Sequence, residues 1–357
     1  MLDELIMTLQ SNRDLSSEQM TIVMDEILSG KYDDNTIAKF LQNLTLKGET
    51  NDELLAMLEK MNQFSVSISP NCQNRIIDMC GTGGDNLKTF NISTTASFVV
   101  AAAGGYIAKH GNRSVSGVSG SADIFEYFGF DLDSEPSKIV NMIEKIGIGF
   151  MFAPKFHPAM KNVVNARKIL SKRTAFNLLG PLSNPANVKH QLIGVFADDY
   201  IKRIVKIMQK NHSETILAVR SEDGMDELST TSKNKACMLK NNEVTEFIIN
   251  PADYNIGNSS LSDIQISTKQ EAIDAFLNVL NNTSNTTMLN ITILNAAGGL
   301  LVGNVCDRFD EGVELARETI KSGKAFEKLK QFAKETNSLE KLEGIDWIGE
   351  YSRKACK

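Results

Sequence analysis

The sequence predicts an α/β protein in which a small N-terminal all-helical domain precedes a larger α/β domain with a mostly parallel central sheet. Three observations predict this class. Apolar residues recur at helical spacing before residue 65, short apolar runs alternate with helical segments between residues 75 and 219, and two loops rich in small residues follow predicted strands. The 357 residues suffice for one substantial core and a smaller one.

The N-terminal segment has the periodicity and the end signals of helices. The apolar positions at helical spacing, which we interpret as core, are Leu5, Met7, Ile22, Val23, Ile27, Leu28, Phe40, Leu41 and Leu44. Helix ends are indicated by the capping boxes Ser16/Gln19 and Thr50/Glu53 and by Gly30 and Gly48. The polar segment Ser65–Asn74 then leads to the first predicted strand.

Strands and helices alternate after this linker. The predicted strands are Arg75–Met79, Tyr106–Ala108, Gly149–Phe152, Leu192–Phe196 and Thr215–Val219. The predicted helices between them are Ser93–Ala103, Ala122–Phe128, Ser137–Ile146 and Tyr200–Lys210. This alternation favours a mostly parallel sheet with its ligand at the carboxyl ends of the strands. From Lys269 onward the chain is predicted to be helical, and Ala325–Thr336 is expected to be an exposed, lysine-rich amphipathic helix.

The first glycine-rich loop, Asp78–Asp85, suits a phosphate. Gly81, Gly83 and Gly84 allow positive φ and carry no Cβ, so consecutive backbone N–H groups can point at one anion. The segment Asn91–Thr94 then resembles a capped helix start, which adds unpaired N–H donors and a partial positive charge. A plain turn between strand and helix is the alternative interpretation.

Nucleotide motifs do not fit this loop. A dinucleotide fingerprint needs glycine where Asn86 stands, and no Gly-Lys-Ser/Thr occurs.

The second loop, Lys109–Gly117, places Lys109, His110, Asn112 and Arg113 almost consecutively after a predicted strand. Serines and glycines follow as far as Ser121. An ordinary surface loop is also rich in serine and glycine, but it rarely concentrates these polar and basic side chains beside a strand end. The sequence therefore predicts a second phosphate cradle that also offers cationic side chains.

Composition limits the class of protein without selecting it. A net charge of −6 and a pI of about 5.4 disfavour nucleic acid or a membrane surface as the main partner. No basic region precedes an apolar stretch at the N-terminus, so we expect no export signal and a cytoplasmic location. Neither a disulfide framework nor a zinc site is expected from the five cysteines, Cys72, Cys80, Cys237, Cys306 and Cys356.

Taken together, the motifs resemble those of the anthranilate phosphoribosyltransferases of tryptophan biosynthesis, which share their fold with pyrimidine nucleoside phosphorylases. The likeness covers most of the chain. It depends on Gly81–Asp85, Asn91–Thr94, Lys109–Arg113, Ser119–Asp123, Phe152–Pro154, His157–Lys161, Arg173–Leu182 and Asp223–Glu227. The resemblance implies a helical domain of residues 1–72 joined in space by about 158–186, and an α/β domain of residues 73–157 and 187–357. It also implies a homodimer through the helical domain and, since no glutamine amidotransferase segment is evident, a stand-alone enzyme.

The implied reaction transfers the phosphoribosyl group of phosphoribosyl pyrophosphate to the amine of anthranilate and releases pyrophosphate. By resemblance, the donor is bound by Gly81, Gly83, Gly84, Asp85, Thr89, Asn91, Ile92, Ser93, Thr94, Lys109, His110, Gly111, Asn112, Arg113, Ser114, Val115, Ser116, Gly117 and Ser121. Mg²⁺ suits a diphosphate because both ion and ligand oxygens are hard.

The resemblance also implies the metal and acceptor sites. Two Mg²⁺ ions per subunit are expected, held through Ser93, Asp226 and Glu227. Without the resemblance, an Asp-Glu pair would be interpreted as solvated surface. The residues expected at anthranilate are Gly81, His110, Asn112, Arg167, Gly180 and Pro181. Arg167 is the expected carboxylate partner, because a guanidinium can bind a carboxylate bidentately, although a lone arginine on a helix is more often a surface group.

Several assignments stay open at this level. No catalytic residue is assigned, although His110 could accept the released proton or simply shape the pocket, while His157 is expected to be structural and Arg173 has no assigned role. Relatives often have His-Gly shortly before the acidic string, whereas this chain has Arg220-Ser221, which puts the local loop shape in question.

Three other functions remain to be considered. A pyrimidine nucleoside phosphorylase would use inorganic phosphate, an inert relative could bind nucleic acid, and an oxidoreductase would need the dinucleotide fingerprint that Asn86 interrupts.

Overall fold

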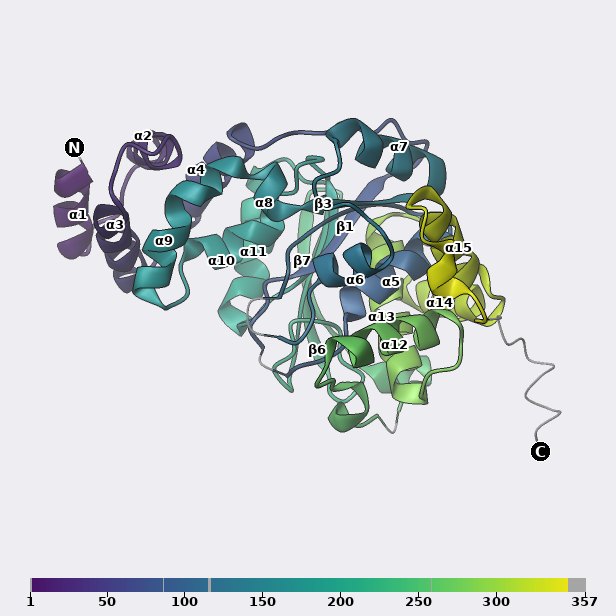
Figure 1. The fold of residues 1–357 in the computed structure, drawn as a ribbon. Coiled ribbons are helices and arrows are strands. Elements are labelled where there is room, and N and C mark those ends of the chain that lie inside the picture. The colour runs from purple at the N-terminus through teal and green to yellow at the C-terminus, as the bar shows by residue number, and fades with distance from the viewer. Residues whose placement is uncertain (1, 86, 115–116, 258, 346–357) are drawn as a thin grey trace.

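The computed structural model of the protein describes residues 2–85, 87–114, 117–257 and 259–345. Figure 1 shows an elongated molecule with the first helices at one end, the central sheet in the middle, and the last described helices at the opposite end. None of the helices in these ranges is both long and apolar enough to cross a membrane.

Four helices form the N-terminal end of the molecule. They are α1 (Leu2–Gln10), α2 (Ser17–Leu28), α3 (Asp34–Lys47) and α4 (Asn51–Gln63). The capping boxes at Ser16 and Thr50 are confirmed. Each hydroxyl accepts a hydrogen bond from the backbone N–H three residues later, and the side chain of that later residue accepts one from the backbone N–H of the capping residue. Gly30 and Gly48 have φ of 77° and 87°, conformations that favour glycine after a helix end.

Two positions interpreted as core are exposed instead. Met7 is 56 % exposed and Ile22 is 42 % exposed, although the other seven apolar positions of this set are buried. Both lie on the outer face of the helices, where helical spacing cannot distinguish a residue that faces the core from one that borders it.

Residues 158–182, which follow the short helix α8 (Ala153–Phe156), pack against these helices. They comprise α9 (Lys161–Leu170) and α10 (Ala175–Leu179), with 3₁₀ turns at Pro158–Met160 and Gly180–Leu182. Helix α9 contacts α3 and α2, and α10 contacts α4. The side-chain amide of Asn162 donates to the carbonyl of Leu28 at 2.8 Å. Residues far apart in sequence therefore share one helical region (Figure 1).

A seven-stranded sheet forms the centre of the described chain. Its strands are β1 (Ile76–Gly81), β2 (Tyr106–Gly111), β3 (Ile148–Phe152), β4 (His190–Gly194), β5 (Thr215–Ser221), β6 (Asn234–Lys240) and β7 (Glu243–Ile249). The order is β3-β2-β1-β4-β5-β6-β7, with β1 to β5 parallel and β6 and β7 antiparallel. The mostly parallel sheet is confirmed.

The hairpin of β6 and β7 was missing from the sequence prediction. Most side chains of β7 are exposed, since it forms the edge of the sheet, and an exposed strand has no continuous apolar run. A usable signal was present: Asn241 and Asn242 have φ of 52° and 63° and form a two-residue connection, which Asn favours in hairpins.

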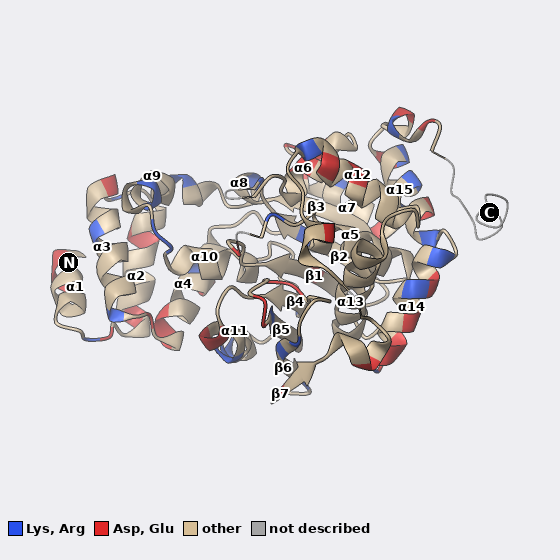
Figure 2. Cartoon of the chain, turned by 90° about the horizontal axis from the view of Figure 1, so that it is seen from below, with Lys and Arg blue, Asp and Glu red and all other residues tan. Residues whose placement is uncertain are grey.

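The other helices are α5 (Ile92–Ala102), α6 (Ser121–Tyr127), α7 (Pro136–Ile146), α11 (Asp198–Lys210), α12 (Lys269–Leu280), α13 (Thr286–Val302), α14 (Phe309–Lys321) and α15 (Lys324–Glu335). Of these, α5, α7, α11 and α13 contact the sheet, while α12, α14 and α15 pack on those helices as an outer layer. Shorter 3₁₀ turns lie at Pro251–Tyr254, Leu261–Ile264 and Leu339–Leu342. Lys and Arg alternate with Asp and Glu along outer helices such as α14, which is typical of solvated helix faces (Figure 2).

Two apolar clusters lie on opposite faces of the sheet. Leu192 and Leu217 join α5 and α13 in one cluster, whereas Ile193 and Ile216 join α11 and the N-terminal helices in the other. This division follows from the alternation of side chains along a strand. Helix α15, expected to be exposed, buries its apolar face, including Phe332, against α5.

Candidate functional site

Two adjoining cavities open at the carboxyl ends of β1 and β2. The larger, of about 590 Å³, we call the polar cavity, and the smaller, of about 430 Å³, the apolar cavity. Gly81, His110, Asn112 and Arg167 line both of them. This location is the one expected for ligands of a parallel α/β sheet.

The glycine loop after β1 forms one wall of the polar cavity. Gly83 and Gly84 have φ of 73° and 84°, as expected for a backbone nest. Gly81, where glycine also allows positive φ, does not adopt it, because it is the last residue of β1. Glycine is needed at position 81 because a larger residue would not fit: a Cβ there would lie 2.5 Å from the Oδ2 atom of Asp226.

The start of α5 connects the two predicted loops. Asn91 was expected to cap this helix, but its side chain makes no capping hydrogen bond. Its Nδ2 atom donates instead to the carbonyl of Ser119 at 3.2 Å, and Thr94 donates to the Ser121 hydroxyl at 2.9 Å. The buried Oδ1 atom of Asn91 has no partner among the described residues. The helix N-terminus and the second loop are therefore held together by side chains.

The predicted basic loop begins within a strand. Lys109 and His110 belong to β2, because β2 continues as far as Gly111. The Lys109 ammonium is buried and donates to the Met79 carbonyl at 2.5 Å and to the Ser93 hydroxyl at 3.3 Å. Burial lowers the pKa of Lys109, although the nearby carboxylate of Asp78 opposes this shift. A single cation is thus fixed beneath the helix start.

Arg113 is arranged differently from Lys109. Its guanidinium donates to both carboxylate oxygens of Glu126, at 2.8 and 2.7 Å, and to Asp123 at 3.2 Å. The charge of this exposed guanidinium is therefore partly neutralised by carboxylates of α6. The second loop thus contributes a buried cation, Lys109, and a cation that already has acidic partners, Arg113.

The turn after β5, residues 222–228, brings two carboxylates to the glycine loop. The Gly83 N–H donates to the Oδ2 atom of Asp226 at 2.6 Å. Burial and the nearby charge of Asp85 raise the pKa of Asp226 to about 7, and burial and the charge of Asp226 raise the pKa of Glu227 to about 8. Carboxylates in this environment favour the approach of a cation.

Within the described ranges, no three histidine, cysteine or acidic side chains converge on a metal position. A metal here would therefore depend on few protein ligands. That suits Mg²⁺, which usually takes one or two carboxylates and completes its octahedron with water and phosphate oxygens.

The apolar cavity has mainly hydrophobic walls. These walls are contributed by Met61, Ala153, Pro154, Pro158, Met160, Val164, Phe176 and Pro181. The Arg167 guanidinium has no hydrogen bond or ion pair with another described residue, and its Cζ lies 5.9 Å from the centre of the Phe176 ring. An unpaired guanidinium beside a flat apolar slot suits an aromatic carboxylate.

Two histidines border the apolar cavity. Burial, together with the nearby His157 ring and Lys109 charge, lowers the pKa of His110 to about 3, so its imidazole is neutral. The Nε2–H of His157 donates to the Ser183 carbonyl at 2.9 Å, and burial lowers the pKa of His157 as well. Of the two roles considered for His110, shaping the pocket agrees better with this environment than accepting a proton.

The structure brings nearly all predicted site residues to these cavities. Seventeen lie at the polar cavity: Gly81, Gly83, Gly84, Asp85, Thr89, Asn91, Ile92, Ser93, Thr94, Lys109, His110, Gly111, Asn112, Arg113, Ser114, Gly117 and Ser121. Asp226 and Glu227 join them, while Gly180 and Pro181 line the apolar cavity. Val115 and Ser116 lie outside the described residues.

Arg173 and Asn177 also line the polar cavity and were missed by sequence reasoning. Arg173 directly precedes α10 and Asn177 lies within it, and no local pattern predicts where this short helix packs.

Comparison with known families identifies both parts of the chain. Residues 73–326 match the family model described as "Glycosyl transferase family, a/b domain", and residues 3–65 match "Glycosyl transferase family, helical bundle domain". An anthranilate phosphoribosyltransferase of Nitrosopumilus maritimus is 58 % identical over 97 % of this chain and 99 % of the relative. The enzyme of the same name from Cenarchaeum symbiosum is 41 % identical over 91 % of this chain and 94 % of the relative.

Solved structures agree with this likeness. The anthranilate phosphoribosyltransferase of Thermus thermophilus superposes with a TM-score of 0.86 at 29 % identity, covering 93 % of this chain and 99 % of that one. The Saccharomyces cerevisiae enzyme, in complex with PRPP and Mg, superposes with a TM-score of 0.85. At 24 % identity, with 95 % of this chain and 98 % of that one covered, the yeast comparison establishes the fold.

Proposed function

Because this chain belongs to the anthranilate phosphoribosyltransferase family, we propose that it transfers the phosphoribosyl group of phosphoribosyl pyrophosphate to the amine of anthranilate. The amine nitrogen forms a bond to the anomeric carbon, the bond from that carbon to the diphosphate oxygen breaks, and the amine loses a proton. The products are N-(5-phosphoribosyl)anthranilate and pyrophosphate, which makes this the second step of tryptophan biosynthesis from chorismate.

One observation carries this proposal: a polar cavity suited to phosphates adjoins an apolar cavity suited to a small aromatic acid, and both share Gly81, His110, Asn112 and Arg167. A donor in the first cavity and an acceptor in the second would meet at these shared residues. Such positioning of two substrates can supply much of the acceleration of a bimolecular reaction.

The donor side offers fixed dipoles where negative charge develops. The glycine-loop amides and the N-terminus of α5 provide backbone donors, and Lys109 provides a buried ammonium. Because these groups are held by the fold, they need little rearrangement when the diphosphate departs. The bound diphosphate would favour the charged form of Lys109, whose pKa burial has lowered.

Mg²⁺ is proposed to bind through Ser93, Asp226 and Glu227, with two ions per subunit. The buried carboxylate of Asp226, the Glu227 carboxylate beside it and the Ser93 hydroxyl line the same cavity, and few other ligands are present there among the described residues. When bound with the donor, Mg²⁺ would neutralise charge on the leaving diphosphate. The yeast relative was solved with Mg, which is consistent with this assignment.

On the acceptor side, Arg167 is proposed to bind the anthranilate carboxylate, with Gly180 and Pro181 against the ring. Asn112 and His110 lie where the amine would approach the sugar. The neutral imidazole of His110 orients the acceptor rather than taking its proton, and an arylamine needs no prior deprotonation.

A fluorescence assay tests the function. Purified protein with anthranilate, phosphoribosyl pyrophosphate and Mg²⁺ should consume the anthranilate fluorescence, and omission of any one component should abolish the change. Phosphorolysis of thymidine or uridine by inorganic phosphate, with no loss of anthranilate, would instead identify a pyrimidine nucleoside phosphorylase.

The domain division is part of the same proposal. We assign residues 1–72 and about 158–186 to the helical domain, and residues 73–157 and 187–357 to the α/β domain, as the packing of α9 on α2 and α3 supports. Exposed Met7, Ile22 and Leu46 on the helices suit a homodimer interface, and Leu46 is 76 % exposed. A cytoplasmic location is proposed from the biosynthetic role. Light scattering of a Leu46→Asp variant tests the interface, since its mass should fall toward that of the monomer.

A further inference from the structure

The carbonyl groups of the glycine loop are held by an arginine that has no role in the reaction as proposed above. The Nη2 atom of Arg173 donates to the Gly84 carbonyl at 2.7 Å and to the Gly83 carbonyl at 3.2 Å. In a trans peptide the C=O and the following N–H point in opposite directions. By holding these two carbonyls, Arg173 therefore fixes the directions of the Gly84 and Asp85 amides.

Arg173 is in turn positioned by Phe196. The Cζ atom of Arg173 lies 3.9 Å from the centre of the Phe196 ring, which is a close cation–π stack. This contact joins the turn before α10 to the segment after β4. A planar guanidinium can stack with its face and donate with its edge at the same time, which a lysine cannot do.

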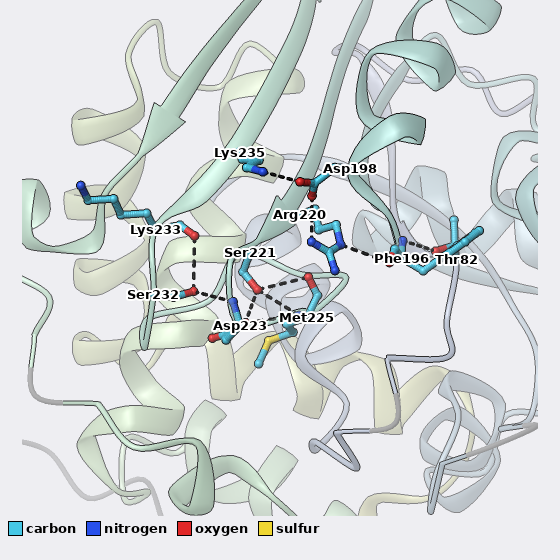
Figure 3. A network of polar contacts seen from close by, with 10 residues as sticks. All are labelled: Thr82, Phe196, Asp198, Arg220, Ser221, Asp223, Met225, Ser232, Lys233 and Lys235. Carbon is cyan, nitrogen blue, oxygen red and sulfur yellow. Dashed lines mark hydrogen bonds and ion pairs between the residues drawn. The ribbon is translucent and has the colours of Figure 1, made fainter.

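The main chain of Phe196 holds the same loop from the other side. Its N–H donates to the Thr82 hydroxyl at 3.0 Å, while its carbonyl accepts from the Nε atom of Arg220 at 3.1 Å. Arg220 also donates to Asp198 at 2.8 Å, and Lys235 forms an ion pair with the second oxygen of that carboxylate. Figure 3 shows this network between β5, β6 and the segment that follows β4.

The residue after Arg220 extends the network to the acidic turn. The Ser221 hydroxyl accepts from the Met225 N–H at 3.0 Å and is hydrogen-bonded to Asp223 (Figure 3). The Ser221 N–H donates to the Met225 carbonyl at 3.1 Å. Arg220 and Ser221 therefore contact both the Phe196 main chain, which supports the glycine loop, and the turn that presents Asp226.

We propose that Arg173, Phe196 and Arg220 are positioning residues that hold the glycine loop in the conformation that binds phosphoribosyl pyrophosphate. We call these three residues the loop brace. The inference rests on the proposed function and deepens it by adding residues that act on the donor through the loop. None of the three is required to contact the reacting atoms.

A comparison of the KM values for the two substrates tests this role. Arg173→Ala should raise the KM for phosphoribosyl pyrophosphate about tenfold or more, with the KM for anthranilate changed less than about threefold. Arg173→Lys should restore only part of the donor affinity, because a lysine cannot stack on Phe196 and donate to the loop carbonyls at the same time. Arg308→Ala is a matched control, since that exposed arginine pairs with Asp310 at the start of α14.

Calorimetric titration of the same variants with phosphoribosyl pyrophosphate and Mg²⁺, without anthranilate, should show the same weakening. This binding readout separates the two proposals. A wild-type protein that binds the donor but does not consume anthranilate overturns the proposed function alone. A wild-type protein that turns over while Arg173→Ala keeps the donor affinity within about twofold overturns the brace alone.

A double-mutant cycle decides whether Arg173 acts through Phe196. Phe196→Leu removes the ring but keeps the main-chain hydrogen bonds, so it should weaken donor binding, and adding Arg173→Ala should cause little further loss. Additive losses, or a Phe196→Leu variant with unchanged donor affinity, would mean that Arg173 acts independently. Arg220→Ala should weaken donor binding less, because Thr82 and Arg173 remain. Thermal unfolding of each variant checks that it is folded.

Discussion

The polar and apolar cavities are built from different kinds of groups. Many main-chain amides and polar side chains line the polar cavity, and several of them are hydrogen-bonded to one another. Gly83 donates to Asp226, Asn91 donates to Ser119, and Lys109 donates to Ser93. Larger apolar side chains line the apolar cavity, with Arg167 as an unpaired cation among the described residues. The polar cavity, which is the proposed donor side, is therefore one interlocked unit, whereas the apolar cavity, the proposed acceptor side, consists of contributions that can be removed singly.

The largest expected effect comes from a residue at the centre of the interlocked side. A Cβ at Gly194 would overlap the carbonyl oxygen of Asp226, so Gly194→Ala must displace the acidic turn. We expect destabilisation of about 1–3 kcal/mol. We also expect a fall in kcat/KM on the order of 10³-fold, because the proposed metal ligands and the glycine loop would move together. Thermal unfolding and steady-state kinetics measure both.

Gly257→Ala is the control for the first prediction, because no other described residue beyond its chain neighbours lies within 4 Å of a Cβ at that position. It should behave like the wild type. Normal kinetics for Gly194→Ala would mean that the donor side tolerates displacement and is not interlocked.

Next in size are the carboxylates of the acidic turn. Asp226→Asn and Glu227→Gln keep the side-chain shape but remove charge, so turnover should fall on the order of 10²-fold and more Mg²⁺ should be needed for half-maximal rate. Magnesium titrations of the initial rate measure this shift. Titration curves that superpose on that of the wild type would remove Asp226 and Glu227 from the metal site.

A smaller and more selective effect is expected on the acceptor side. Arg167→Ala should raise the KM for anthranilate on the order of 10- to 100-fold while the donor KM changes little, because the proposed bidentate pair with the anthranilate carboxylate would be lost without disturbing the loops. Varying each substrate at saturation with the other gives both constants. Equal increases in the two KM values would show that the acceptor side is coupled to the donor side after all.

The smallest effect concerns stability and lies outside both cavities. Burial, with the nearby charge of Arg75, lowers the pKa of His190 to about 4 from the ordinary value of 6.5. Because the pKa of His190 is lower in the folded protein, the unfolded chain binds a proton at this residue at a higher pH than the folded protein does. The contribution of His190 to the free energy of unfolding is therefore fully present above pH 6.5 and is lost as the pH falls toward 4. At pH 5 the loss should be about 2 kcal/mol relative to pH 8.

Denaturant unfolding of wild type and His190→Gln at several pH values measures this slope. The variant should lose less stability on acidification than the wild type. Parallel pH profiles for the two proteins would assign the acid sensitivity to other buried groups, such as His110.

Sequence patterns predicted the parallel part of the sheet well. The predicted strands at residues 75–79, 106–108, 149–152, 192–196 and 215–219 all exist, because a buried strand needs a run of apolar residues that is visible locally. The errors lie at the ends: β2 extends to Gly111, which moves Lys109 and His110 from a loop into the strand. Strand ends depend on pairing with β3, which local sequence does not report.

The candidate site was predicted from the chemistry of the loops and from resemblance. Gly83 and Gly84 adopt positive φ as their sequence suggested, whereas Gly81 is glycine because Asp226 lies against it. Arg113 and Asn91 have partners that could not be predicted, since Glu126 and Ser119 approach them only after the helices pack. The backbone conformation of the loop glycines could therefore be predicted from the sequence, whereas the hydrogen-bond partners of the site side chains could not.

The sequence by itself determined the class of fold, the positions of the two small-residue loops and the family, because periodicity, glycine placement and motif order can be read along the chain. Only the tertiary structure decided which groups meet. It placed Arg173 and Phe196 on the glycine loop, turned Arg113 toward α6, and buried His110 deeply enough to lower its pKa to about 3. These outcomes depend on distances between segments separated by tens of residues, and burial and electrostatic interactions are set by those distances.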